Sequence, residues 1–134
     1  MLKTMKVIGC SPYKGDVTGN TERARRYARH VAVCGYCPVF PHLFFPQFLD
    51  DNDPEERIQG ITLGVELMKV CDEVWIYGTH ISKGMAYELE EAKKLGIPVR
   101  MYDTKCNRIE PATLAIDERV DDAYRKAVYG MKFA

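Results

Sequence analysis

Short apolar runs alternate with longer segments of helical periodicity, and this alternation constrains the fold more than any other feature of the chain. The apolar runs lie at residues 5–10, 37–41, 72–78 and 97–102, and each has the length of a β-strand. Strands that are separated by helices predict a parallel sheet with right-handed crossovers and helices on both faces. We therefore predict an α/β fold, and the 134 residues suit one domain, residues 1–134, with a single sizeable core.

Four helices are predicted between and after these strands. Asn20 is the predicted N-cap of the first helix, and Asp53 followed by a proline is typical of the start of the second. Residues 41–52, which are rich in aromatic residues and proline, are predicted to form a long loop. The predicted helices span residues 20–33, 53–70, 82–96 and 116–128.

The composition argues against several classes of protein. The 19 Lys and Arg residues balance the 19 Asp and Glu residues, so the chain has no net charge to attract nucleic acid or an anionic membrane. No segment approaches the ~20 apolar residues of a spanning helix, and the N-terminus lacks the apolar region of a signal peptide. The five cysteines, an odd number, are predicted to be reduced thiols. We expect a cytoplasmic protein without a nucleic-acid or membrane partner.

The helix predicted at residues 82–96 carries a carboxylate, Glu88, on its apolar face. At about 100° per residue, four apolar residues form one arc that includes the position of Glu88: Met85, Leu89, Ala92 and Leu95. A carboxylate on a core face costs free energy unless it is paired or used. Glu88 is therefore the first candidate for catalysis or ligand binding, and the alternative is a structural ion pair with an Arg or a Lys.

Two loops are predicted to converge on one edge of the sheet. In parallel α/β folds, ligands bind beyond the carboxyl ends of the strands, where the loop after the first strand and the loop before Glu88 both lie. If a phosphate binds there, we expect Lys14, Gly15 and Arg23 to hold it. For His42, a structural role and a functional role are equally supported. The predicted substrate-binding residues are Ser11, Pro12, Lys14, Gly15, Arg23, His42, Gly78, Thr79, Ser82, Gly84 and Met85.

Motifs for metals, redox chemistry and cofactors are weak or missing. Cys34 and Cys37 have C-x-x-C spacing, but they follow a predicted helix C-terminus, where the dipole does not lower a thiol pKa. A second pair that would complete a zinc site is missing. The chain also lacks the glycine-rich motifs that bind triphosphates or dinucleotides. We predict no metal and no cofactor.

The remaining patterned side chains are predicted to be structural. The first helix has a solvated basic face, and the aromatic residues of the 41–52 segment are predicted to cover the core rather than stack on a base. The second helix has a core stripe and a second stripe that we interpret as a subunit interface of a homodimer or higher homo-oligomer. The basic face consists of Arg25, Arg26 and Arg29, and the aromatic residues are Phe44, Phe45 and Phe48. The core stripe of the second helix consists of Ile58, Ile61, Val65 and Met68. Its second stripe consists of Gly60, Leu63, Gly64 and Leu67.

Several segments resemble the nucleoside 2-deoxyribosyltransferase superfamily, in particular a small, uncharacterised branch found in phages and bacteria. Three of them are continuous: residues 9–13, 41–51 and 71–76. The fourth is a spaced pattern over residues 82–99, which consists of Ser82, Gly84, Glu88, Ala92 and residues 95–99. The resemblance covers about residues 5–102. It implies a flavodoxin-like or Rossmann-like three-layer sandwich with a central parallel sheet of about four to five strands.

The resemblance also implies cleavage of N-glycosidic bonds. In characterised relatives, the glutamate at the position of Glu88 attacks C1′ of a 2′-deoxynucleoside, and the sugar passes to another base or to water. Tyr13 is the implied hydrogen-bond donor to this glutamate. Relatives carry an acidic residue on the loop before the glycine that corresponds to Gly84. In this chain, that loop offers Thr79, His80 and Ser82 instead. His80 could supply the missing proton, as could His42 or one of Asp50, Asp51 and Asp53, so the predicted catalytic residues are Glu88, Tyr13 and His80.

Two functions from different classes follow from this resemblance. The first is an enzyme, a transferase or hydrolase, that acts on a small-molecule nucleoside or nucleotide. The second is a non-catalytic protein that binds and sequesters a nucleotide, for example as a phage protein that counters host defence. The retained carboxylate of Glu88 favours catalysis, because a site that only binds anionic ligands would gain affinity by losing it.

Overall fold

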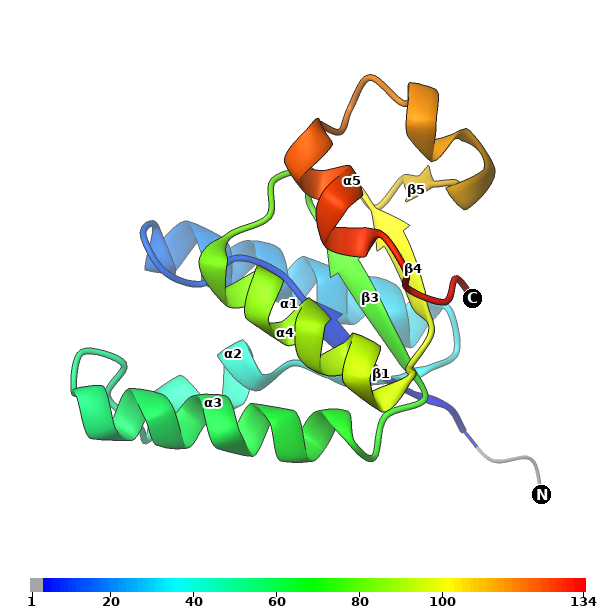
Figure 1. Ribbon diagram of the computed structural model, residues 1–134. Helices are drawn as coiled ribbons and strands as arrows, with labels where there is room; N and C mark the ends of the chain where they lie inside the picture. Colours follow the sequence, from blue (N-terminus) through cyan, green and yellow to red (C-terminus); the bar gives the residue numbers. More distant parts are fainter. Residues whose placement is uncertain (1–3) are drawn as a thin grey trace.

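The computed structural model describes residues 4–134 and has a five-stranded sheet at its centre (Figure 1). The strands are β1 (Lys6–Cys10), β2 (Cys37–Val39), β3 (Glu73–Tyr77), β4 (Val99–Tyr102) and β5 (Arg108–Ile109). Their order is β2-β1-β3-β4-β5, and all neighbours are parallel except β5, which is antiparallel to β4. The predicted α/β class and the four longer strands are confirmed. The two-residue β5 was not predicted, because it is too short to show a periodicity.

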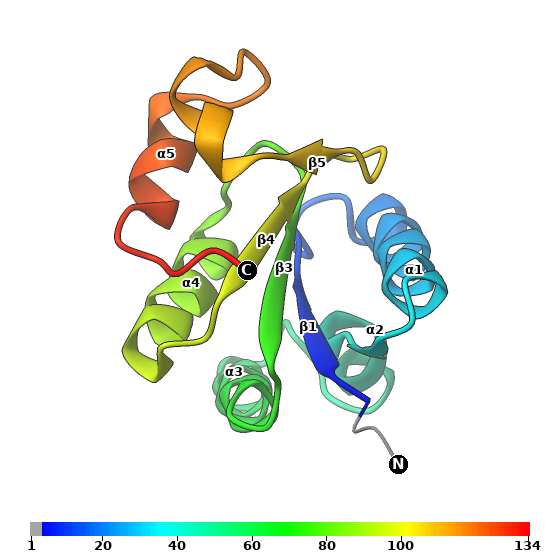
Figure 2. The same cartoon turned by 90° about the vertical axis from the view of Figure 1, so that its right-hand side faces the viewer.

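Helices cover both faces of this sheet, and Figure 2 shows the resulting layers in end view. One face packs against α1 (Val17–Val33), and the other packs against α4 (Lys83–Leu95) and α5 (Asp122–Val128). Successive residues of β3 alternate between the two cores: Trp75 faces α1, and Ile76 faces α4. The whole of β3 is buried, as expected for a central strand with a core on each side.

The start of α1 differs from the prediction. Asp16, not Asn20, is the N-cap, and its carboxylate accepts a hydrogen bond from the Gly19 backbone N–H at 3.1 Å. Asn20 is buried within the first turns of the helix, and its amide donates to the carbonyls of Tyr13 and Lys14 at 3.0 and 3.2 Å. Asn20 therefore fixes the loop after β1 instead of capping the helix. Both residues are good caps, so local sequence alone did not distinguish them.

The segment at residues 41–52, which was predicted as a long loop, contains helical structure. It contains a helical turn, α2 (Pro41–Phe44), followed by a 3₁₀ turn, η1 (Phe45–Gln47). The prediction of aromatic core cover is wrong for Phe44 and Phe48, which are 56% and 57% exposed. Phe45 instead lines a cavity that is described below.

The predicted terminal helix is shorter and starts later than expected. A 3₁₀ helix, η2 (Pro111–Ile116), precedes it, and α5 begins only after its N-cap, Asp121. Between these helices, the Asp117 carboxylate accepts hydrogen bonds from the backbone and guanidinium of Arg119. These local bonds replace helical hydrogen bonds over residues 117–121.

The helix α3 (Pro54–Met68) begins as predicted, with the Asp53 side chain accepting from the Glu55 backbone N–H at 3.1 Å. It lies between α2 and α4 in Figure 2 and buries much less than expected. The predicted core stripe is wrong for Ile58 and Ile61, which are 65% and 41% exposed, whereas Met68 is buried. The helix packs loosely because a cavity lies beneath it.

The glycines of α3 face this cavity. A Cβ atom added to Gly60 would lie 3.7 Å from Leu49, and one added to Gly64 would lie 4.0 Å from Pro41. Gly60 and Gly64 therefore help to shape the cavity, and the interpretation of their stripe as a subunit interface stays a prediction. The oligomeric state and the cytoplasmic location stay predictions. In residues 4–134, no helix is long and apolar enough to cross a membrane.

The five cysteines differ in exposure. Cys34 is the C-cap of α1, in the position predicted, and Cys37 begins β2. Both are exposed, whereas Cys10 and Cys71 are buried. Burial raises the pKa of the Cys10 thiol, and burial followed by the charge of Asp72 raises the pKa of Cys71 to about 11. The residues that the structure describes contain no cluster of ligands suited to a metal ion.

We expect thiol labelling of the native protein to follow these differences. At a pH of about 8, a disulfide reagent should modify Cys34 and Cys37 first, because it needs an accessible thiolate. Cys10 and Cys71 should react only after unfolding in denaturant. Mass spectrometry of the labelled peptides would check the order, and early labelling of Cys10 in the native protein would contradict its buried position.

Candidate active site

A cavity of about 460 Å³ lies between α3, α4, α2 and the loop that follows β1. Its volume falls within the range of about 300–1,000 Å³ that is typical of small-molecule sites. It lies at the edge of the sheet where the sequence predicted a ligand site. Its polar and charged lining residues are Ser11, Tyr13, Lys14, His42, Asp51, Glu56, Arg57, Ser82, Lys83, Tyr87 and Glu88.

Local sequence signals place Glu88 at this cavity. The Ser82 side chain caps α4 by accepting from the Met85 backbone N–H at 3.2 Å, and Gly96 ends the helix in the left-handed conformation at φ 69°. Glu88 follows in the second turn, with its side chain 21% exposed. The predicted apolar arc around it is confirmed for three residues but not for Leu95, which is 41% exposed at the end of the helix.

His42 is the side chain that lies against the carboxylate of Glu88. Its Nε2 atom lies 3.5 Å from Oε1 of Glu88, and the two side chains are 30% and 21% exposed. At this distance a protonated His42 forms an ion pair with the carboxylate. Among residues 4–134, no Lys or Arg forms an ion pair with Glu88, so the alternative of a structural pair with a Lys or Arg is not what the structure shows.

Tyr13 contacts His42 instead of Glu88. The two rings stack with centroids 5.0 Å apart and an interplanar angle of 20°. Burial, and then the charge of Asp51, raise the pKa of Tyr13, so its phenol stays protonated at neutral pH. No hydrogen bond joins Tyr13 to Glu88 in the described part of the chain, and the implied role of Tyr13 as the donor stays a prediction. The aromatic stack orients His42 toward the carboxylate.

Two buried side chains at the end of β1 lie near Glu88 or the cavity. Cys10 does not line the cavity, but its Sγ atom lies 3.9 Å from the Met85 carbonyl. Burial raises the pKa of the Cys10 thiol most, and the charge of Glu88 and a hydrogen bond to Glu88 raise it further. Ser11 is 2% exposed and lines the cavity, but its Oγ has no hydrogen-bond partner in residues 4–134. An unpartnered buried hydroxyl is costly. A polar atom of a bound ligand would satisfy it.

The structure brings only part of the predicted site together. Arg23 turns away from the cavity and binds Asn20 and Asp16 at 2.7 and 3.5 Å, and His80 is exposed outside the cavity. The predicted residues that line the cavity are Ser11, Tyr13, Lys14, His42, Ser82, Gly84, Met85 and Glu88. Those that do not line it are Pro12, Gly15, Arg23, Gly78, Thr79 and His80.

Sequence reasoning missed several charged residues of the cavity. Glu56 and Arg57 lie in the first turns of α3, and Lys83 is the first residue of α4. Asp51 was predicted only as one of several possible proton donors. The signal that could have found these residues is their position at helix N-termini, which in α/β folds lie at the same edge as the carboxyl ends of the strands.

Comparisons with known proteins support the fold. The model of a family described as "Domain of unknown function (DUF7768)" matches residues 5–102. None of the curated proteins matches the chain.

Solved structures that are similar to this chain, with TM-scores above 0.5, include the following three. A 2-deoxyribosyltransferase from Bacillus psychrosaccharolyticus is 19% identical at a TM-score of 0.57, over 96% of this chain and 98% of that chain. A 2-deoxyribosyltransferase from Leishmania mexicana is 12% identical at a TM-score of 0.57, over 97% of this chain and 83% of that chain. A conserved protein from Enterococcus faecalis V583 is 14% identical at a TM-score of 0.56, over 98% of this chain and 90% of that chain. These similarities confirm the predicted fold.

Proposed function

The chain belongs to the DUF7768 family, a domain of unknown function, and for this member we propose cleavage or transfer at the N-glycosidic bond of a 2′-deoxynucleoside or its monophosphate. The observation that carries the proposal is the pairing of Glu88 with His42 at the wall of a cavity of ligand size. The likeness of the fold to two 2-deoxyribosyltransferases supports it.

Glu88 acts as the nucleophile in this proposal. One carboxylate oxygen forms a bond to C1′ of the sugar while the bond from C1′ to the base nitrogen breaks, and the electron pair of that bond leaves with the base. The resulting glycosyl ester is then displaced at C1′ by water, which gives hydrolysis, or by a second base, which gives transfer. Both outcomes regenerate the carboxylate of Glu88. The covalent intermediate replaces one difficult displacement by two easier ones.

His42 is a positioning residue for this nucleophile. Glu88 must be ionised to attack C1′. A protonated His42, with Nε2 3.5 Å from Oε1, stabilises that charge and holds Oε1 in place. The stack on Tyr13 fixes the plane of the imidazole.

Asp51 is the proposed proton donor to the leaving base. Of the candidate donors from the sequence, His42 and Asp51 line the cavity, whereas His80 does not. His42 is engaged with Glu88, whereas the Asp51 carboxyl makes no hydrogen bond or ion pair within residues 4–134. A donor of this kind contributes about 10²–10⁴-fold to the rate.

The direct test is the release of free base. The wild-type protein is incubated with the four common 2′-deoxynucleosides and with their 5′-monophosphates, and free base is separated by chromatography. Addition of a second, different base then separates transfer from hydrolysis. We expect base release from at least one substrate. Binding of a nucleotide that raises the Tm, without release of base from any substrate, would instead establish the non-catalytic, sequestering function.

We expect His42→Gln to lower kcat for base release by about 10- to 100-fold, because the amide cannot carry the positive charge that supports Glu88. KM should change less than kcat, and the Tm should stay within a few degrees, since both side chains are partly exposed. Steady-state kinetics and thermal unfolding check both outcomes.

The matched variant is His80→Gln, which changes an exposed histidine outside the cavity. It should change kcat by less than about twofold, as expected for a surface substitution. A larger loss in His80→Gln than in His42→Gln would transfer the role to His80 and contradict the assignment.

A further inference from the structure

Three cations line the cavity without an ion-pair partner. Lys14 comes from the loop after β1, Arg57 from the first turns of α3, and Lys83 from the first position of α4. Within residues 4–134, their side chains form no ion pair and no hydrogen bond. Three segments that are distant in the sequence therefore bring free positive charge to one site.

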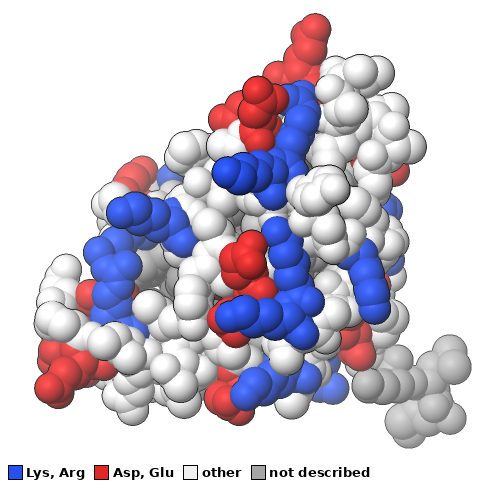
Figure 3. Space-filling view, viewed as in Figure 1, with Lys and Arg blue, Asp and Glu red and all other residues white. Residues whose placement is uncertain are grey.

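Lys83 is set apart from Glu88 along α4. Lys83 precedes Glu88 by five residues on α4, which corresponds to ~7.5 Å along the helix axis. This separation is comparable with the length of a deoxyribose ring and its 5′ arm. Figure 3 shows Lys and Arg side chains forming a column at the left of this face, above the amino-terminal end of α3.

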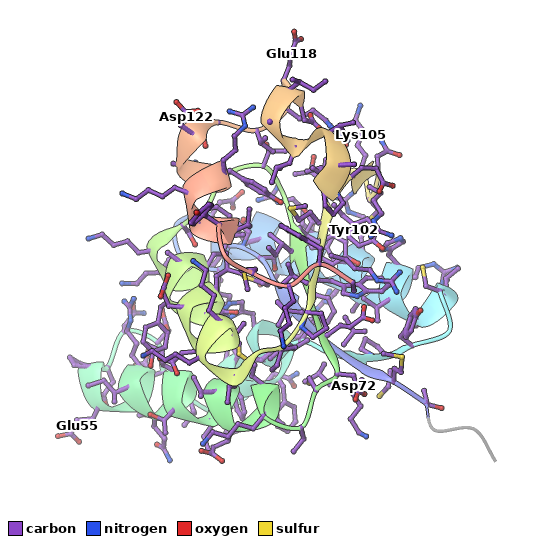
Figure 4. All side chains as sticks on the ribbon, turned by 45° about the vertical axis from the view of Figure 1, so that its right-hand side comes forward. Glu55, Asp72, Tyr102, Lys105, Glu118 and Asp122 are labelled. Carbon is purple, nitrogen blue, oxygen red and sulfur yellow. The ribbon has the colours of Figure 1, made fainter. Side chains whose placement is uncertain are left out.

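The acidic residues near these cations have other neighbours or point elsewhere. Glu55 projects outward from the start of α3, away from the rest of the molecule (Figure 4). Glu56 lines the cavity and accepts from the Asp50 backbone N–H at 3.4 Å. Asp51 lies near Tyr13: burial raises the pKa of the Tyr13 phenol most, and the charge of Asp51 raises it further. The cations are therefore not neutralised by direct contact and can bind an anionic group of a ligand.

We propose that Lys14, Arg57 and Lys83 bind the 5′-phosphate of a 2′-deoxynucleoside monophosphate, and that the protein selects this nucleotide over the free nucleoside. This inference rests on the proposed function, because it assumes that Glu88 lies at C1′ of the bound sugar. Arg23, the cation expected from the sequence to hold a phosphate, is bound to Asn20 and Asp16 instead.

The chemistry of the three side chains suits a phosphate monoester. The monoester carries about −1.5 to −2 charges at pH 7 and three acceptor oxygens. The half-buried guanidinium of Arg57 presents parallel N–H donors that match two of those oxygens. The exposed ammonium groups of Lys14 and Lys83 add point charges from two other directions. Because the ionised Glu88 repels the phosphate, the cations must also offset this repulsion for the nucleotide to bind.

The first experiment measures selectivity in the wild-type protein and in Arg57→Gln and Lys83→Gln. The measured quantity is the ratio of kcat/KM for a 5′-monophosphate to kcat/KM for the matching nucleoside. We expect the wild type to prefer the monophosphate, and each variant to lower the ratio by about 10- to 100-fold, as for the loss of a charged hydrogen bond. Arg29→Gln and Lys126→Gln, which remove exposed cations outside the cavity, are the matched controls and should keep the wild-type ratio.

The second experiment separates this inference from the proposed function. Glu88→Gln protein is titrated calorimetrically with the monophosphate, the nucleoside and inorganic phosphate, so that binding is measured without turnover. Tighter binding of the monophosphate that is lost in Glu88→Gln/Arg57→Gln supports the phosphate site even if the wild type releases no base. Equal binding of monophosphate and nucleoside, or an unchanged selectivity ratio in Arg57→Gln and Lys83→Gln, overturns the phosphate site and leaves base release as a separate result.

Discussion

Glu88→Gln is expected to lower the rate of base release by at least about a thousandfold, because the amide keeps the shape of the side chain but cannot act as the nucleophile. The Tm should stay within a few degrees of wild type, because the partner of Glu88 is a partly exposed histidine at 3.5 Å. Chromatographic assays of base release and thermal unfolding would check the two outcomes together.

A matched control is available on the same helix. Glu90→Gln removes a carboxylate that is 62% exposed and pairs with Lys93 at 3.1 Å on the surface. Both the rate and the Tm should stay close to wild type, because surface pairs of this kind contribute about 0–1 kcal/mol. Activity of Glu88→Gln within tenfold of wild type would remove Glu88 from the role of nucleophile, whereas a large loss of stability would point to a structural role.

Gly9→Ala is expected to have the largest effect on stability. Gly9 lies in the interior strand β1, and a Cβ atom at this position would collide with the ring of Phe40. Phe40 is 8% exposed and belongs to the core beneath α1, so its ring has little room to move. We expect a loss of about 2–3 kcal/mol in the free energy of unfolding, or roughly 10 °C in Tm. Urea and thermal unfolding would measure it.

The same collision connects the core to the candidate site. Phe40 directly precedes the helical turn that carries His42, so a displaced ring should also weaken the contact between His42 and Glu88. Folded Gly9→Ala protein should therefore release base more slowly than wild type. Adding Phe40→Leu should make the double variant more stable than the sum of the two single changes, because the smaller side chain relieves the collision.

Gly64→Ala is the control for the glycine argument. A Cβ atom at Gly64 would meet only Pro41, at 4.0 Å, and alanine is favoured over glycine inside a helix by about 1 kcal/mol. The variant should be as stable as wild type or more stable. A loss in Gly64→Ala as large as that in Gly9→Ala would show that the collision with Phe40 is not the cause.

Local signals in the sequence were sufficient for much of the fold. The apolar runs predicted β3 and β4 because their side chains must be buried on both faces of the sheet. Asp53, followed by a proline, predicted the start of α3, because the hydrogen bond of this cap lies within a few residues. Glu88 was found in the same way, since its place on an apolar arc depends only on the geometry of one helix.

The α/β class, the four longer strands and the choice of Glu88 as the first candidate for the site could be predicted without a structure, because each depends on residues close together in the chain. The surroundings of Glu88 could not, because they depend on how distant segments pack. His42 lies on a helical turn that was predicted as a loop, and its contact with Glu88 depends on how α2 packs beside α4. Arg57 faces the cavity because α3 packs over the cavity rather than against the sheet. The periodicity of the helix does not show which of its faces will cover a cavity.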